Sequence, residues 1–269
     1  MTGLADIIAA TRRRVRECRS KGNLRELEQQ ADSHVPRGFR RKLELASKSG
    51  IAIVAELKKR SPSRGLIRSN FDPVALAREL EQAGAAALSV LTDEEFFSGS
   101  LANLRTASDM TQLPCLRKDF ILDEFQILEA RANRADAILL ITAALSQEEL
   151  AALVKRATEF QLDVLCEVHD EEELGRALDA GCDLIGVNSR DLRTFNVDLT
   201  IAFRLADSIP PNVVAVAESG IESGADIAHL HSAGYDAFLI GESLMRAESP
   251  SEALKKLLTE ATASSAAAQ

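Results

Sequence analysis

From residue 51 onward, short apolar runs of strand length alternate with longer amphipathic segments. A short apolar run bounded by turn residues indicates a buried strand, whereas apolar residues recurring three and four apart indicate a helix. Strands that alternate regularly with helices form a parallel sheet. The pattern predicts strands at residues 51–57, 87–91, 114–117, 137–141, 163–168, 184–187, 213–217 and 237–240.

Capping residues and glycines mark helix boundaries in the same region. Asp72 before Pro73, and Ser146 followed by Glu149, are typical helix starts. They support helices at residues 73–83, 146–160, 171–180 and 224–233. Three of these helices are expected to stop at a glycine that precedes a strand, namely Gly84, Gly181 and Gly234.

The first fifty residues show no strand-like alternation and are expected to be helical. The first helix carries basic residues, Arg14 among them, that we expect to form a solvated face. The chain therefore divides into a helical extension at residues 1–50, a β/α body at residues 51–261, and a small polar tail at residues 262–269 that is expected to be disordered.

Eight strands over about 200 residues suit a closed (β/α)8 TIM barrel better than an open doubly wound sheet. The glycine-rich dinucleotide fingerprint expected after the first strand of an open sheet is absent. The expected fold is thus α/β, a TIM barrel with an N-terminal helical extension.

Composition narrows the classes of partner. A net charge of −9, with one Tyr and no Trp, argues against a nucleic-acid partner, because phosphate backbones need basic surfaces and exposed bases need aromatic platforms. The longest apolar stretch, at residues 137–145, is far shorter than the roughly 20 residues that span a bilayer. No signal-peptide pattern opens the chain, so we expect no membrane association and a cytoplasmic location.

The cysteines and histidines offer no metal site. Cys18, Cys115, Cys166 and Cys182 are scattered, which favours buried thiols in a reducing compartment over a zinc or disulfide framework. No cluster has metal-ligand spacing, so no metal is expected. Of the four histidines, His169 is the best placed, two residues after Glu167, yet none is expected to take part in the chemistry.

Ionisable and amide side chains accumulate where the predicted strands end. In a TIM barrel these ends converge on one mouth, which is where active sites lie. Side chains alternate along a strand, so two residues spaced as Glu56 and Lys58 share a face. The candidates are Glu56 and Lys58 after the first strand, Lys118 after the third, Glu167 after the fifth, Asn188 and Arg190 after the sixth, and Glu218 after the seventh.

The last two strands lead into loops of small residues that could cradle a phosphate. Ser219-Gly220 follows the seventh strand and Gly241-Glu242-Ser243 follows the eighth. Backbone N–H groups near glycines and helix starts attract anions, and barrels frequently bind phosphate at these two loops. Glu242 is expected to contribute its amide and to turn its carboxylate away.

Several chemical roles are open for the charged groups at this stage. Lys58 and Lys118 could act as acids, as partners of carboxylates, or as Schiff-base nucleophiles. Glu56, Glu167 and Glu218 could act as bases or hold those lysines in place.

These residues fall in motifs that resemble the indole-3-glycerol-phosphate synthase family of tryptophan biosynthesis. The run ELKKRSPS at residues 56–63 is similar to the family signature after the first strand. The resemblance extends from about Leu4 to Leu258, and the motifs that follow the first, third and sixth strands are together highly specific. The further motifs lie at residues 89–93 with Phe96, Phe97 and Gly99-Ser100, and at residues 116–121, 167–169, 186–192, 217–221 and 240–245.

The resemblance implies a carboxy-lyase that converts 1-(2-carboxyphenylamino)-1-deoxyribulose 5-phosphate to indole-3-glycerol phosphate, carbon dioxide and water, without a cofactor. It implies that Lys118 acts on the carbonyl oxygen, that Lys58 beside Glu56 meets the carboxylate and serves as an acid, and that Glu167 is the final base. Asn188, Glu218 and Ser219 would complete the catalytic set. The implied substrate-binding residues are Ser61, Phe97, Phe120, Arg190 on the anthranilate side, Gly220, Gly241, Glu242 and Ser243.

Some positions depart from the family pattern. Ser189 and Ser98 replace residues more usual in the family, and Asn133-Arg134 stands where a glycine stop is expected. Another phosphosugar barrel, such as an isomerase, epimerase or Schiff-base aldolase, stays an alternative, as does a non-catalytic barrel. Retention of both acids and bases argues against the latter. Association with other enzymes of tryptophan biosynthesis is left open.

Overall fold

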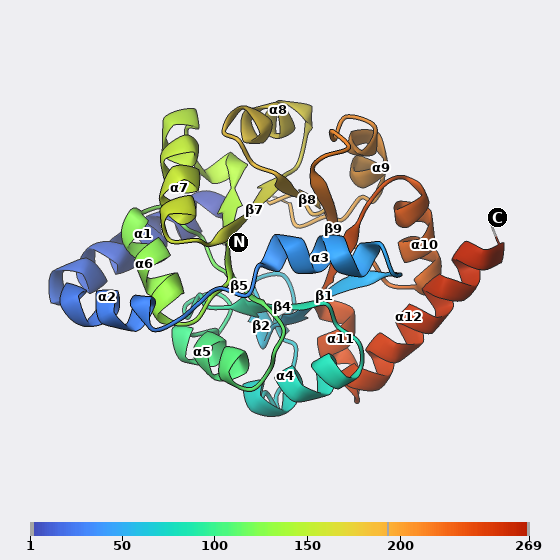
Figure 1. Cartoon of the computed structure of the whole chain (residues 1–269), viewed down its shortest axis with the longest axis horizontal. Coiled ribbons are helices and arrows are strands. Elements are labelled where there is room, and N and C mark those ends of the chain that lie inside the picture. Colours follow the sequence, from blue (N-terminus) through green and yellow to red (C-terminus); the bar gives the residue numbers. More distant parts are fainter. Residues whose placement is uncertain (1–2, 193, 268–269) are drawn as a thin grey trace.

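The computed structural model describes residues 3–192 and 194–267, and its centre is a closed barrel of eight parallel strands (Figure 1). The strands follow one another around the barrel in chain order, and the last pairs with the first. The predicted TIM barrel is confirmed, with each strand end within one residue of its prediction. The strands are β1 (Ala52–Leu57), β4 (Ala87–Leu91), β5 (Cys115–Lys118), β6 (Ala137–Ile141), β7 (Asp163–Val168), β8 (Leu184–Asn188), β9 (Val214–Glu218) and β10 (Ala237–Ile240).

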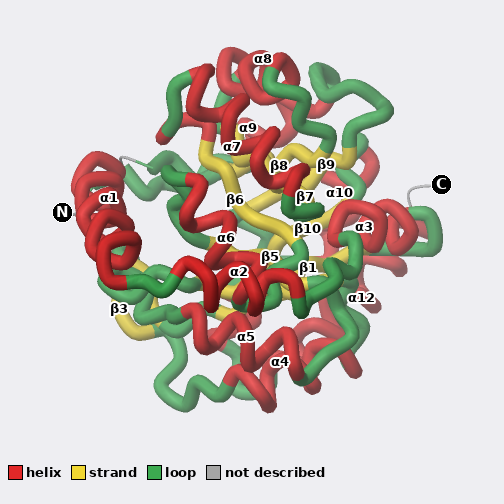
Figure 2. The backbone as a smooth tube through the Cα atoms, turned by 60° about the vertical axis from the view of Figure 1, so that its left-hand side comes forward, coloured by secondary structure: helices red, strands yellow, loops and turns green. Residues whose placement is uncertain are grey.

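Helices surround the strands (Figure 2). Asp72 accepts a hydrogen bond from the N–H of Val74, and Ser146 forms a reciprocal capping box with Glu149, as the sequence predicts. The barrel helices are α4 (Pro73–Gln82), α5 (Leu101–Asp109), α6 (Glu124–Ala132), α7 (Gln147–Glu159), α8 (Glu171–Asp179), α9 (Thr200–Ala206), α10 (Gly224–Ser232), α11 (Glu242–Arg246) and α12 (Pro250–Ala267), with a 3-10 turn, η1 (Thr142–Ala144), after β6. In the described part of the chain, no helix is long and apolar enough to cross a bilayer.

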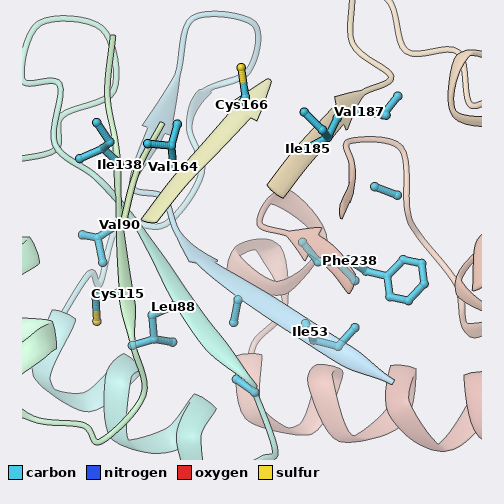
Figure 3. Close-up of a cluster of buried hydrophobic side chains, with 14 of the residues drawn as sticks. Ile53, Leu88, Val90, Cys115, Ile138, Val164, Cys166, Ile185, Val187 and Phe238 are labelled. Carbon is cyan, nitrogen blue, oxygen red and sulfur yellow. The ribbon is translucent and has the colours of Figure 1, made fainter. Parts of the chain in front are cut away.

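Alternation along the strands separates two hydrophobic layers. In β1, Ile53 and Ala55 face outward into the layer between barrel and helices, whereas Ala52 and Val54 face the barrel interior. Figure 3 shows the outward layer, in which side chains such as Ile53 and Val90 come from different strands. Because Glu56 continues the inward series, its side chain must emerge inside the mouth of the barrel.

The N-terminal extension runs from one end of the barrel to the other. Its helices are α1 (Leu4–Lys21), α2 (Leu24–Asp32) and α3 (Phe39–Ser47). α1 lies at the mouth, where Ile7 lines the central cavity. α2 packs against α6, and α3 crosses the opposite end of the barrel (Figure 1), where Phe39 and Leu43 are fully buried against the interior layer. The extension therefore belongs to the hydrophobic core rather than to an independent unit.

Aspartates at the starts of strands anchor α3 and the segment before it. Asp136, directly before β6, is fully buried and accepts hydrogen bonds from the Arg37 side chain, the Arg37 N–H and the Cys115 N–H. Asp163, which opens β7, accepts the N–H of Arg40 at 2.9 Å. These contacts are ionic anchors that join the extension to the base of the barrel.

Two expectations were wrong, and one element was not predicted. α12 continues to Ala267, so residues 262–267 are helical rather than disordered, and residues 268–269 lie outside the described chain. Arg14 is not on a solvated face, because it pairs with Asp93 and Asp119 in the loops after β4 and β5. The loop after β1 contains a small hairpin, β2 (Arg60–Ser61) with β3 (Gly65–Leu66), that the apolar pattern did not indicate.

The three predicted glycine stops are confirmed, and α6 ends differently. Gly84, Gly181 and Gly234 all adopt positive φ at the ends of their helices. Arg134 adopts the same left-handed backbone, with φ of 65°, at the end of α6. Its side chain forms an ion pair with Asp109, so an arginine takes the place of the expected glycine in a strained conformation.

Candidate active site

The C-terminal ends of the strands surround one cavity of about 570 Å³. Because side chains from strands far apart in the sequence reach it, the expectation that the strand ends converge is confirmed. Every candidate residue predicted from the sequence lines this cavity: Glu56, Lys58, Ser61, Phe97, Lys118, Phe120, Glu167, Asn188, Arg190, Glu218, Ser219, Gly220, Gly241, Glu242 and Ser243.

Lys118 lies between two carboxylates at the centre of the cavity. Its Nζ is 3.1 Å from Glu167 Oε2 and also donates to Glu218 Oε2. Both carboxylates are buried, and the lysine side chain is only 12% exposed. Buried charges of this kind are tolerated only when they are paired. The three residues therefore form one coupled acid–base unit, contributed by β5, β7 and β9.

The surroundings shift the pKa of each of these three groups. Burial alone would lower the pKa of Lys118, but the carboxylates of Glu218 and Glu167 raise it above its ordinary value. Burial alone would raise the pKa of Glu167, but Lys118 and His169 hold it below its ordinary value. Burial raises the pKa of Glu218 to about 7, with Lys118 opposing the rise. The site thus holds a cationic acid beside an anionic base.

Glu56 and Lys58 form a second lysine–carboxylate pair, with Nζ 2.5 Å from Oε1. They share the inward face of β1, as their spacing predicts. Neighbouring glycines give the carboxylates room. A Cβ at Gly241 would lie 2.2 Å from Glu56 Oε1, and one at Gly186 would lie 2.2 Å from Glu218 Oε1. Any larger residue at these two positions would displace a glutamate of the site.

The loops after β9 and β10 place small residues and a hydroxyl group at the cavity. Ser219 and Gly220 have φ of 65° and 78°, so the chain leaves the strand conformation at these two residues. Ser243 Oγ is buried and, within residues 3–192 and 194–267, has no hydrogen-bond partner. From the loop after β1, Ser61 Oγ lies 3.4 Å from Ser63 Oγ and accepts the N–H of Arg64 at 3.2 Å.

Three arginines surround Glu242 after β10. Its carboxylate lies 3.1 Å from Arg64 Nε and 3.5 Å from guanidinium nitrogens of both Arg190 and Arg246. The negative charge of Glu242 is therefore offset by neighbouring cations. Arg190 also donates to the carbonyl oxygen of Phe195.

Apolar side chains line part of the cavity. Phe120 is buried and packs with the barrel interior, while Phe97 is half-buried against the same layer. Ile7 from α1 and Leu239 from β10 belong to that layer and also line the cavity. A cavity lined by both apolar and charged side chains suits a ligand that joins an aromatic ring to an anionic chain.

Several lining residues were missed by sequence reasoning. Ile7 belongs to the extension, and nothing in the local pattern places α1 over the mouth. Arg64 and Arg246 lie three residues after Ser61 and Ser243, so proximity to a motif was the only available signal. His169 was set aside, although its imidazole Nε2 lies 3.5 Å from Glu167 Oε1.

Comparison with known sequences decides the family. The sequence model described as "Indole-3-glycerol phosphate synthase" matches residues 4–257. The chain belongs to the indole-3-glycerol phosphate synthase family. A family member from Koribacter versatilis is 58% identical over 255 residues, which cover 95% of this chain and 98% of that protein. The member from Chlorobium luteolum is 48% identical over 245 residues, which cover 91% of this chain and 93% of that protein.

Solved structures reveal wider similarity in fold. Thiamine phosphate pyrophosphorylase from Pyrococcus furiosus superposes with a TM-score of 0.61 at 18% identity, covering 81% of this chain and 98% of that one. At this identity the similarity concerns the barrel alone. Membership of the synthase family rests on the sequence matches.

We expect Glu218→Gln to stabilise the folded protein at alkaline pH. A carboxyl group whose pKa is raised on folding favours the folded state while protonated, and this contribution is lost as pH rises through about 7. Glutamine stays neutral, so the variant should have the higher Tm at about pH 8 and should approach the wild type below about pH 4.5.

Thermal unfolding across this pH range measures the effect. Glu222→Gln, at an exposed position on the loop after β9, is the matched control and should show no comparable pH-dependent gain. A Tm difference for Glu218→Gln that is the same at all pH values would contradict the expectation.

Proposed function

We propose that this protein catalyses ring closure, decarboxylation and dehydration of 1-(2-carboxyphenylamino)-1-deoxyribulose 5-phosphate to indole-3-glycerol phosphate. The observation that carries the proposal is Lys118 held between Glu167 and Glu218, with a second lysine–glutamate pair in the same cavity. The substrate is anionic at both ends, and Lys58, Lys118 and three arginines line the cavity as cations that can meet those charges. Membership of the synthase family supports the same reaction.

The phosphate is placed against the loops after β9 and β10. The N–H groups of Gly220, Gly241, Glu242 and Ser243 are the proposed donors, and the free Ser243 hydroxyl is a further one. Ser61 joins them from the loop after β1. This arrangement orients the sugar chain toward the lysines and glutamates of the cavity.

The anthranilate ring is placed against the apolar side chains of Phe97 and Phe120. Lys58, held by Glu56, meets the carboxylate of the substrate, and Arg190 adds positive charge. Asn188 and Ser219 complete the polar surroundings of the reacting carbons. Orientation of this kind is valuable because the reaction joins two parts of one flexible molecule.

Lys118 is the proposed acid for ring closure. The ring carbon that bears the carboxylate attacks the carbonyl carbon, and the carbonyl oxygen takes a proton from Lys118. Carbon dioxide then leaves, and its bonding electron pair returns to the ring. The pKa of Lys118 is raised chiefly by its two carboxylate partners, so protonation of Glu218, whose pKa is about 7, would make Lys118 a stronger acid.

Dehydration and proton removal complete the reaction. Lys58 protonates the departing hydroxyl group, which leaves as water. Glu167 then accepts a proton from the methylene carbon next to nitrogen, and the indole ring becomes aromatic. Glu167 suits this role because its carboxylate is buried yet held ionised by Lys118 and His169.

The direct test is continuous fluorescence detection of indole-3-glycerol phosphate from the purified protein and the carboxyphenylamino sugar phosphate. We expect product without any added metal or cofactor. Borohydride treatment during turnover should trap no substrate on Lys58 or Lys118. Covalent reduction onto either lysine would instead identify a Schiff-base enzyme and would overturn the decarboxylative mechanism.

A further inference from the structure

His169 lies behind Glu167, between two glutamates. Its Nδ1 is 2.9 Å from Glu173 Oε2, and its Nε2 is 3.5 Å from Glu167 Oε1. The same oxygen of Glu173, on α8, also accepts the backbone N–H of His169 at 2.9 Å. The imidazole is therefore fixed at one edge, and its other edge points at the proposed base.

The hydrogen-bond pattern defines the protons on the ring. A carboxylate only accepts, so Nδ1 carries a proton that it donates to Glu173. Nε2 is buried and makes no hydrogen bond of normal length with any described residue, and the carboxylate of Glu167 is the acceptor it faces. A proton on Nε2 as well produces an imidazolium between two carboxylates, with one N–H directed at each of them.

The charges around this pair favour the same form. Burial alone would lower the pKa of His169, but Glu173 and Glu167 raise it above its ordinary value of 6.5. Glu218 lies further away and acts in the same direction. On the other side of Glu167 stand Lys118, which holds Oε2, and the amide of Asn188.

We propose that His169 is a positioning residue that, held by Glu173, keeps the carboxylate of Glu167 ionised and oriented toward the substrate. The proposal rests on the proposed function, in which Glu167 removes the final proton. It assigns a role to a histidine that does not touch the reacting atoms. The cation acts through Oε1, whereas Lys118 acts through Oε2.

A second cation is needed because of the order of proton transfers. When Lys118 gives its proton to the carbonyl oxygen, it loses its charge. The buried Glu167 would then lack a counter-charge at the stage that precedes its action as a base. An imidazolium that takes no part in the earlier steps keeps Glu167 ionised until it accepts the final proton.

The kinetic test is the pH profile of kcat in His169→Asn, His169→Gln and Glu173→Gln. Loss of a cation a few ångströms from Glu167 should raise the pKa of its carboxyl group. The acidic limb of the profile should therefore move to higher pH by about one unit in both His169 variants. KM should change little. Glu173→Gln should move the limb in the same direction by less. Exposed residues provide matched controls, His229→Asn and Glu172→Gln, and neither should move the limb.

A purely structural role would give a different result. It would lower kcat by the same factor at every pH and leave the acidic limb in place, and that outcome overturns the proposal. His169→Gln keeps an amide donor without the charge, so a wild-type profile in this variant would show that charge is unimportant.

An NMR titration tests the same idea without catalysis. The protein has four histidines, and the ring signals of His169 are identified by their loss in His169→Asn. Its midpoint should lie above 6.5 and should fall in Glu173→Gln and in Glu167→Gln. A midpoint at or below the ordinary value overturns the proposal even if the synthase activity is present. Absence of wild-type turnover would instead overturn the proposed function.

Discussion

Lys118→Ala and Glu167→Gln are each expected to lower kcat by about 100-fold or more, the low end for loss of a positioned acid or base. Lys118 is the only lysine that contacts both buried carboxylates among the described residues, so no neighbour replaces its proton. Glu167→Gln keeps the shape of the side chain but removes the lone pair that accepts the final proton. Steady-state fluorescence kinetics with saturating substrate measure both effects.

Matched variants control for charge and fold. Lys59→Ala removes a lysine next to Lys58 that does not line the cavity, and Glu172→Gln removes an exposed glutamate. Both should retain kcat within about twofold, since surface changes are usually small in effect. Circular dichroism is the check that Lys118→Ala is folded. Near-wild-type kcat in Lys118→Ala and Glu167→Gln would refute the assigned roles.

Asp136→Ala is expected to destabilise the protein by about 3–5 kcal/mol, the range for breaking a buried ion pair. Asp136 is fully buried and receives hydrogen bonds from Arg37, His34 and the N–H of Cys115. Its removal leaves a partly buried guanidinium and a buried backbone donor without an acceptor. Urea unfolding at neutral pH measures the loss.

Asp236→Ala is the matched control. Asp236 precedes β10 as Asp136 precedes β6, and it accepts the N–H of Ala215 at 2.8 Å. It has no ion pair with any described residue, so its replacement should cost about 1 kcal/mol, the value of one hydrogen bond. Equal losses in the two variants would show that the link to Arg37 contributes nothing.

The penalty in Asp136→Ala should also depend on pH. Burial alone would raise the pKa of Asp136, but hydrogen bonds from His34 and Arg37 hold it below the ordinary value of 3.8. A carboxyl group with a lowered pKa stabilises the fold above its ordinary pKa, and this contribution is lost as pH falls through the folded value. The difference between variant and wild type should therefore shrink below about pH 4.

Several features were predictable because they depend on neighbours in sequence. Strand limits such as 87–91 and 137–141 were predicted to the residue, since a buried strand needs an unbroken apolar run. Helix starts at Asp72 and Ser146 were likewise visible, because a cap acts on the next three residues. The shared face of Glu56 and Lys58 follows from strand alternation alone.

Other features depend on contacts between distant residues. Arg14 looked like part of a solvated basic face, but the loops after β4 and β5 bring Asp93 and Asp119 to it. The sequence offered no reason to give His169 a role. Its proposed role depends on the contact with Glu173, four residues onward, and on which edge of the ring faces Glu167. Neither geometry is encoded in a local pattern.

The sequence by itself determined the barrel, its strand limits to within one residue and the candidate residues that converge on its mouth, because hydrophobic periodicity and the order of strands along the chain can be read from the sequence alone. Only the tertiary structure decided how those residues pair. It places Lys118 between Glu167 and Glu218 and brings the extension over both ends of the barrel. The reason is physical: pairing and pKa depend on distances of a few ångströms between groups that the chain separates by 49 residues in one pair and 100 in the other.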